Sequence, residues 1–334
     1  MTSILLPSDH LTGTAAERRH LRALLAGLRA SPGPAPLPGI TFRALPDVLA
    51  SGLADPALFA AGYEHLSRRY RDLGMSAMLP LTRVWVGVTS SAPPGDPSAC
   101  GGFHHPGQGY RHLQAAATVT AYGDLTTPGT PSSPQSAALD LLRSYAHDCL
   151  HYGTYRRYRL TADHQAARVQ YGINFRTIGG GTYSAPDQPG ARVTRNLGIV
   201  MEGATDSEAT TIARMTAAVA GISAMDGPPG IAGYAYQDTT GTLTSRAAAK
   251  AMTSPDPYLR ALGSFSHIIT RRYQNFADSL GGQPGELHQV IVAAMISGSL
   301  TALETWLDAR HGPAAFARYF QSPAWDARLE LGAG

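Results

Sequence analysis

Two histidines, His147 and His151, lie four residues apart in a stretch whose apolar residues recur with a helical period. The period predicts a helix over residues 136–158. Residues at positions i and i+4 lie on one face of a helix, one turn apart. Two imidazoles placed in this way can bind a single zinc ion, each at about 2.0–2.1 Å. The segment is therefore constrained to fold as a helix that presents both rings to one side.

A catalytic zinc ion needs a third protein ligand, because its fourth position is left to water. Glu202 is the best candidate, since it follows an apolar run and lies early on a helix predicted over residues 197–220. Asp206 lies one turn later on the same face, where a carboxylate can orient a ligating imidazole. Glu202 follows His151 by 51 residues (202 − 151).

Together the two segments resemble a known family pattern. His147-Asp148-x-x-His151, followed by Glu202-Gly203-Ala204-Thr205-Asp206, is similar to the gluzincin metallopeptidases, the thermolysin-like clan. These proteins carry His-Glu-x-x-His on one helix and Glu-x-x-x-Asp on the next. The resemblance implies zinc bound by His147, His151 and Glu202. It also implies a supporting role for Asp206 and gives Asp148 the position of the general base.

Asp148 is also where the chain departs from this pattern. Its carboxylate is one methylene shorter than that of glutamate, so its oxygen would lie about 1.5 Å further from the water. A misplacement on that scale can lower a rate on the order of 100-fold. The connection to Glu202 is also longer than a minimal one. A β-hairpin predicted at residues 167–185 fills it and is expected to lie over the site.

Other candidate residues have weaker signals. His267 and Tyr273 lie on a helix predicted over residues 257–280, where either could stabilise an oxyanion. Three further histidines lie on a hairpin before the metal helix, where gluzincins keep the strand that pairs with substrate: His104, His105 and His112. Two alternatives stay open for the His147–His151 pair: a solvated or hydrogen-bonded helix face, and a relative that has lost its metal.

The order of the predicted elements indicates an α+β fold. We expect a small antiparallel sheet packed on the zinc-binding helix, followed by a mostly helical C-terminal part, as in a zincin. The predicted regions are an N-terminal helical region at 1–75, a zincin-like core at 76–225 with a hairpin inserted at 160–195, and a helical C-terminal region at 226–334. Within these, helices are predicted at 13–30, 44–72 and 284–310, and strands at 81–88, 99–105 and 112–119.

Composition limits the class of protein. The net charge of +3 is too small to indicate a nucleic-acid partner, and the longest apolar stretch, near residues 290–296, is too short to cross a membrane. Residues 1–10 have no signal-peptide pattern, so we expect a cytoplasmic protein. Two cysteines, Cys100 and Cys149, are too few for a disulfide framework, so both are expected to be buried thiols.

The sequence thus predicts a zinc-dependent hydrolase that acts on a peptide, amide or ester bond. A dedicated tailoring enzyme for a small molecule, as in natural-product biosynthesis, is one form of this hypothesis. The alternative is a non-catalytic, zincin-like binding protein in which the metal is structural or absent. The sequence does not fix the substrate or the oligomeric state.

Overall fold

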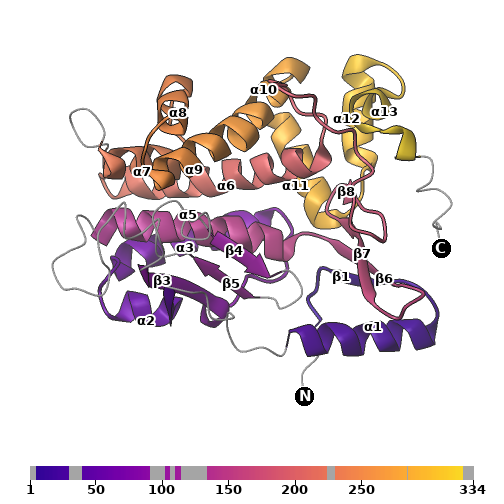
Figure 1. The fold of residues 1–334 in the computed structure, drawn as a ribbon, viewed down its shortest axis with the longest axis horizontal. Helices are drawn as coiled ribbons and strands as arrows, with labels where there is room; N and C mark the ends of the chain where they lie inside the picture. Colours follow the sequence, from indigo (N-terminus) through magenta and orange to yellow (C-terminus); the bar gives the residue numbers. More distant parts are fainter. Residues whose placement is uncertain are drawn as a thin grey trace.

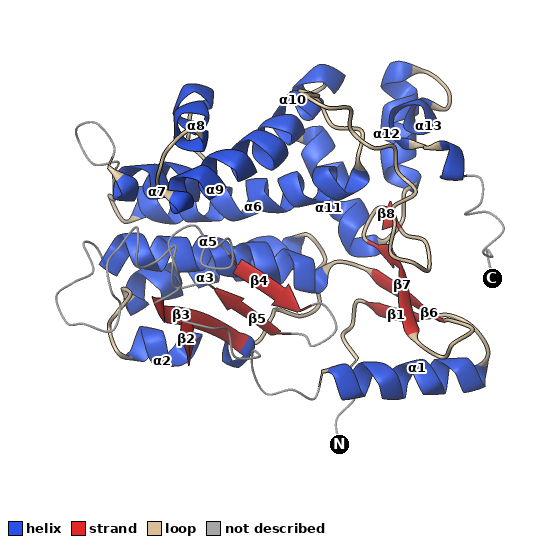
Figure 2. Ribbon diagram, in the orientation of Figure 1, coloured by secondary structure: helices blue, strands red, loops and turns tan. Residues whose placement is uncertain are grey.

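Two small β-sheets and a layer of helices make up the fold, which is α+β (Figures 1 and 2). The structure is a computed structural model, and it describes residues 5–29, 40–90, 102–105, 110–113, 134–223, 230–283 and 285–325. Most of the buried apolar side chains form one continuous core that runs from Leu45 to Trp325. None of the helices in these ranges combines the length and apolarity that crossing a bilayer requires.

The first sheet precedes the predicted metal-binding helix in the chain. Its strands are β2 (Ile40–Ala44), β3 (Val84–Ser90), β4 (Gly102–His105) and β5 (Tyr110–Leu113), in the order β2-β3-β5-β4. Strands β3 and β5 are parallel, and the other pairs are antiparallel. The predicted purely antiparallel sheet is therefore wrong, because the β4–β5 hairpin places its second strand beside β3. Strand β4 is left at the edge.

The second sheet consists of β1 (Asp9–Leu11), β6 (Arg156–Leu160), β7 (Ala166–Tyr171) and β8 (Asn174–Phe175), in that order. It is also mixed, since β1 and β6 are parallel. A β-hairpin lies within the predicted range 167–185, with β7 and β8 as its strands, and β6 forms where the sequence predicts the end of the preceding helix. The N-terminal 75 residues, predicted as helical, also contribute β1 and β2 to the two sheets.

Helix α1 (Ala15–Leu28) covers the second sheet, and Thr14 caps its N-terminus. The Thr14 side chain accepts the backbone N–H of Glu17, and the Glu17 carboxylate accepts the N–H of Thr14 in return. This reciprocal pair satisfies two amides that the first turn leaves without helical partners. Leu21 and Leu25 then pack against Tyr158 of β6.

A pair of long helices forms the centre of the fold. Helix α5 (Pro134–Gly153) contacts α6 (Leu197–Val219) along its length, and α3 (Pro56–Asp72) packs against both. The short α2 (Leu45–Ala50) and the 3₁₀ turn at Leu81–Arg83 lie beside the first sheet. Cys149 is buried on α5 as a free thiol, as predicted; Cys100 lies outside the described residues.

The C-terminal part is helical, as predicted. Its elements are α7 (Ile231–Thr239), α8 (Ser245–Met252), α9 (Pro257–Phe265), a π-helical turn (Ser266–Thr270), α10 (Arg271–Leu280), α11 (Glu286–Ser297), α12 (Thr301–His311), α13 (Ala315–Phe320) and a 3₁₀ turn (Pro323–Trp325). The helix predicted over 284–310 is broken at Gly298, which has φ +72°. A Cβ there would lie 2.3 Å from the ring of Tyr155, so this close approach requires glycine.

Candidate metal centre

Three side chains from α5 and α6 converge at one point. His147 and His151 come from the last turns of α5, and Glu202 comes from the second turn of α6. Their donor atoms all lie within 4.8 Å of one another. The two Nε2 atoms are 3.0 Å apart, and each lies 3.1 Å from one oxygen of Glu202. The structure therefore brings together the three residues that the sequence predicted as metal ligands.

The spacing and the chemistry of the three donors fit a metal ion. Ligands at 2.0–2.1 Å from a tetrahedral ion are about 3.3–3.4 Å apart, so the observed donors need to separate by only about 0.3 Å. The side chains of His147 and His151 are 12% and 11% exposed, and that of Glu202 is 32% exposed. The group is thus mostly buried, and Glu202 is its most exposed member.

The charges also suit ligation. Burial alone would raise the pKa of Glu202, but the two neighbouring imidazoles hold it well below its usual value. Burial lowers the pKa of His151, although the Glu202 carboxylate opposes this effect. At neutral pH the carboxylate is therefore charged and the His151 ring is neutral. These are the protonation states that bind metal.

Tyr171, which the sequence did not single out, supports His151 from the hairpin. Its hydroxyl lies 2.7 Å from Nδ1 of His151, the nitrogen on the far side of the ring from the converging donors. Such a hydrogen bond fixes the tautomer and orientation of a ligating imidazole. The Tyr171 ring is itself held by the guanidinium groups of Arg168 and Arg156, at 4.4 and 5.5 Å from its centroid. The predicted hairpin thus reaches the metal group through one side chain.

Arg156 caps the C-terminal end of α5. It is 1% exposed and lies on β6, just after α5 ends. Its guanidinium donates to the carbonyl oxygens of His151, Tyr152 and Thr154. It also donates to the hydroxyl of Ser8 at 2.9 Å. Arg156 therefore complements the C-terminal end of α5 from the following strand.

Asp206 has partners other than the imidazoles. Its carboxylate forms an ion pair with Arg143 of α5, and it accepts the hydroxyl of Thr270 at 3.0 Å. Arg143 precedes His147 by one turn, and Asp206 follows Glu202 by one turn. The contacts His147–Glu202 and Arg143–Asp206 therefore lie one turn apart along the antiparallel helices α5 and α6. This register places Asp206 beside Arg143 instead of the predicted imidazole. Among the described residues, Nδ1 of His147 has no hydrogen-bond partner.

The predicted base, Asp148, is fully buried on α5. The helix turns it about 100° away from His147. Its carboxylate is close enough to His151 and Tyr171 to perturb the pKa of each. The structure therefore places Asp148 beside the metal group but away from solvent.

The two predicted oxyanion-stabilising residues have different surroundings. His267 is exposed on the π-helical turn. Tyr273 is buried on α10, and its Cβ packs against Gly203, the neighbour of Glu202. The Tyr273 hydroxyl lies 2.7 Å from Nδ1 of His288, whose Nε2 is 2.9 Å from Glu208. Tyr273 thus belongs to a second tyrosine–histidine–carboxylate chain.

The predicted substrate-side histidines, His104, His105 and His112, lie on β4 and β5, where the structure describes the backbone pairing and not the side chains. No family model, no curated protein and no solved structure matches the chain. The resemblance to gluzincins therefore depends on the sequence motif and on the geometry of the metal group.

Proposed function

We propose that the chain is a zinc-dependent hydrolase that cleaves a peptide, amide or ester bond. The observation that carries this proposal is the convergence of His147, His151 and Glu202. A His₂Glu donor set with an accessible fourth position is a catalytic type of zinc site, whereas structural zinc sites are closed by four protein ligands. The exposed side of Glu202 supports the catalytic type.

Zinc bound in this group would polarise a carbonyl and lower the pKa of a bound water to about 7. The protein side chains have separate tasks. Tyr171 orients His151, and Arg156 holds the helix end that carries it. Asp148 is the candidate to accept a proton from water and return it to the leaving group. Tyr273, whose Cβ packs against Gly203, the residue after Glu202, is the candidate to support charge on the substrate.

The position of β4 supports a zincin-like arrangement. It is the edge strand of a sheet that contacts α5 through β5. An extended substrate can add to such an edge by backbone hydrogen bonds. A peptide would use this edge along its length, whereas a small-molecule substrate, such as a natural-product intermediate, would use it only in part.

The complete burial of Asp148 favours a second candidate, a non-catalytic binding protein in which the metal stabilises the fold. A base must reach the reacting water, and a carboxylate without solvent access does so only if the site opens. The two candidates share the metal ligands and differ in turnover.

Metal analysis tests the site that both candidates share. Protein purified without chelator should contain about one zinc per chain, and His147→Ala, His151→Ala and Glu202→Ala should each abolish binding. His164→Asn is the matched control, because His164 is exposed and Asn tolerates its left-handed backbone at φ 59°. Metal content well below one equivalent in the wild type would refute the site.

A hydrolysis screen then separates the two candidates. We expect the zinc-loaded wild type to cleave at least one class of fluorogenic peptide, amide or ester substrate, and His151→Ala to lose that activity. Full zinc occupancy without turnover on any class would support the binding protein instead.

A further inference from the structure

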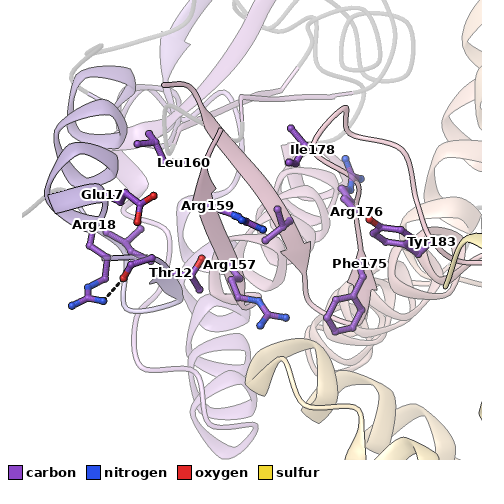
Figure 3. A pocket seen from close by; sticks show the side chains of 13 residues that line it. Thr12, Glu17, Arg18, Arg157, Arg159, Leu160, Phe175, Arg176, Ile178 and Tyr183 are labelled. Carbon is purple, nitrogen blue, oxygen red and sulfur yellow. Dashed lines mark hydrogen bonds between the residues drawn. The ribbon is translucent and has the colours of Figure 1, made fainter. Parts of the chain in front are cut away.

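A cavity of about 470 Å³ lies on the second sheet, and none of the metal ligands lines it. Its walls come from the end of β1, the first turn of α1, strands β6 to β8 and the segment that follows β8. Figure 3 shows the β6 side chains on one side of this space and Phe175, Arg176 and Tyr183 on the other. The volume is within the range of about 300–1,000 Å³ that is usual for small-molecule sites.

The charge of this cavity is strongly positive. Four arginines line it, Arg18, Arg157, Arg159 and Arg176, against one acid, Glu17. The four positive charges and one negative charge leave a net charge of +3. The Glu17 carboxylate is already occupied by the backbone N–H of Thr14, at 2.6 Å. The cavity therefore holds an excess of cationic groups that its own acid does not balance.

Arg176 is the clearest unused donor. Its guanidinium makes no hydrogen bond or ion pair with any residue in the described ranges, and its Nε is buried. Arg157 bonds the neutral side chain of Gln170 and lies over the ring of Phe175, at 5.7 Å. A guanidinium can bind a carboxylate or phosphate through two parallel hydrogen bonds. An anion placed here would relieve the repulsion among the arginines.

Most of the remaining lining residues are apolar. Leu160, Val169 and Phe175 form part of the wall, and Ile178 lies at the edge with 49% of its surface exposed. An exposed isoleucine beside a cationic cavity offers surface that a bound apolar group would remove from water. Neither an inorganic ion nor a neutral apolar molecule would use both kinds of surface.

We propose that this cavity binds a small organic anion, with a carboxylate or phosphate held by Arg176 and Arg157 and an apolar body against Phe175 and Ile178. The site is separate from the metal centre. The hairpin strand β7 connects the two, because it carries Val169 in the cavity wall and Tyr171 at His151.

Calorimetric titration of the full chain with four probes tests this proposal. Octanoate and octyl phosphate each have an anionic head group and an apolar body. Octanol has only the apolar body, and inorganic phosphate has only the anionic group. Both amphipathic anions should bind at least about 10-fold more tightly than octanol or phosphate. The tighter of the two identifies the preferred head group. Octanol binding as tightly as octanoate, or phosphate as tightly as octyl phosphate, would overturn the proposal.

Substitutions in the cavity lining test whether the anions bind there. Arg176→Gln should weaken both amphipathic anions by about 10–100-fold and leave octanol unchanged, because it removes a charged bidentate donor. Arg195→Gln, at an exposed arginine outside the cavity, should change nothing. Ile178→Glu, at an exposed position that should tolerate the change, should also weaken both anions. Anion affinity unchanged in Arg176→Gln and Ile178→Glu would refute the site.

The metal centre needs a separate control, because carboxylates and phosphates also bind zinc. The titration is therefore repeated with His151→Ala, which removes a metal ligand but none of the cavity lining. Binding that persists in this variant supports the cavity whatever the outcome for the proposed hydrolase. Binding that disappears would assign the anion to the metal and overturn the proposal.

Discussion

Removing one hydroxyl, in Tyr171→Phe, should weaken metal binding by about 10–100-fold. The hydroxyl lies 2.7 Å from Nδ1 of His151 and holds the ring with Nε2 toward the other donors. The Tyr171 ring lies against the guanidinium groups of Arg156 and Arg168, so phenylalanine should keep the same position. The substitution therefore removes the contacts of this hydroxyl with Nδ1 of His151 and with the carbonyl oxygen of His151, 3.3 Å away, and little else.

The expected loss corresponds to about 1.4–2.7 kcal/mol of metal-binding free energy. This agrees with about 1–3 kcal/mol for leaving a buried polar group without its partner, since Nδ1 of His151 would lose the bond. Competition with a chromophoric chelator measures the zinc dissociation constant of each variant directly. Thermal unfolding of the metal-free proteins shows whether the fold itself has changed.

Tyr273→Phe is a closely matched control. Its hydroxyl also lies 2.7 Å from a histidine Nδ1, but that histidine, His288, is not one of the metal donors. Zinc affinity should therefore stay within about 2-fold of the wild type in Tyr273→Phe. An equal loss in both variants, or no loss in Tyr171→Phe, would show that Tyr171 does not position the ligand.

Three further predictions concern the candidate base Asp148, the ion pairs of the buried Glu208, and the packing of α6. Asp148→Asn should keep zinc and lose hydrolysis, whereas Asp148→Glu should keep both. Full activity of Asp148→Asn, measured with the substrate found in the screen, would remove Asp148 from the mechanism. Burial would raise the pKa of Glu208, but its histidine and arginine partners lower it from 4.5 to about 2. Its contribution of about 3 kcal/mol is complete above about pH 4.5 and is lost as pH falls toward 2. Urea unfolding at about pH 6 and about pH 3 should show the stability gap between wild type and Glu208→Gln closing at the lower pH, and a constant gap would contradict this. Gly203→Ala should destabilise the fold by about 1–3 kcal/mol, because its Cβ would lie 2.2 Å from Cβ of the buried Tyr273. Gly27→Ala, with nothing within 4 Å, should instead be stabilising in the same unfolding assay.

Two of the three candidate metal donors could be predicted from local information. The i,i+4 spacing fixes His147 and His151 on one face of any helix that forms there. Glu202 depended also on the family resemblance, because local pattern predicts the helix that begins near residue 197, which Asn196 caps by accepting the N–H groups of Gly198 and Ile199, but not the turn of α5 that it faces. Short-range patterns therefore specified most of the donor set.

The role of Asp206 could not be predicted, because it depends on how two helices align. The family pattern places it beside an imidazole, but Arg143 occupies the adjacent turn of α5 and pairs with it. The spacing of residues within α5 or within α6 does not predict which turn of one helix faces which turn of the other. Tyr171 was missed for a related reason, since its contact with His151 depends on how the hairpin folds back.

The residue at which α5 ends could not be predicted from local sequence either. Residues 154–158 are compatible with a helical continuation by composition, yet the chain leaves the helix at Gly153 and enters β6. The pairing of β6 with β1 and β7 decides this, and those partners lie far away in the sequence. The π-helical turn before α10 likewise has no pattern that marks it.

Arg156 ties the metal helix to the start of the chain. The guanidinium that holds the carbonyl of His151 also binds the hydroxyl of Ser8, and the backbone N–H of Arg156 donates to the carbonyl of Ser8 at 2.7 Å. The helix with its two histidines is therefore not a portable unit that could be grafted alone onto another scaffold. A graft would have to include β1 and β6, and a deletion through residue 11 would loosen the turn that carries His151 although every metal donor would still be present.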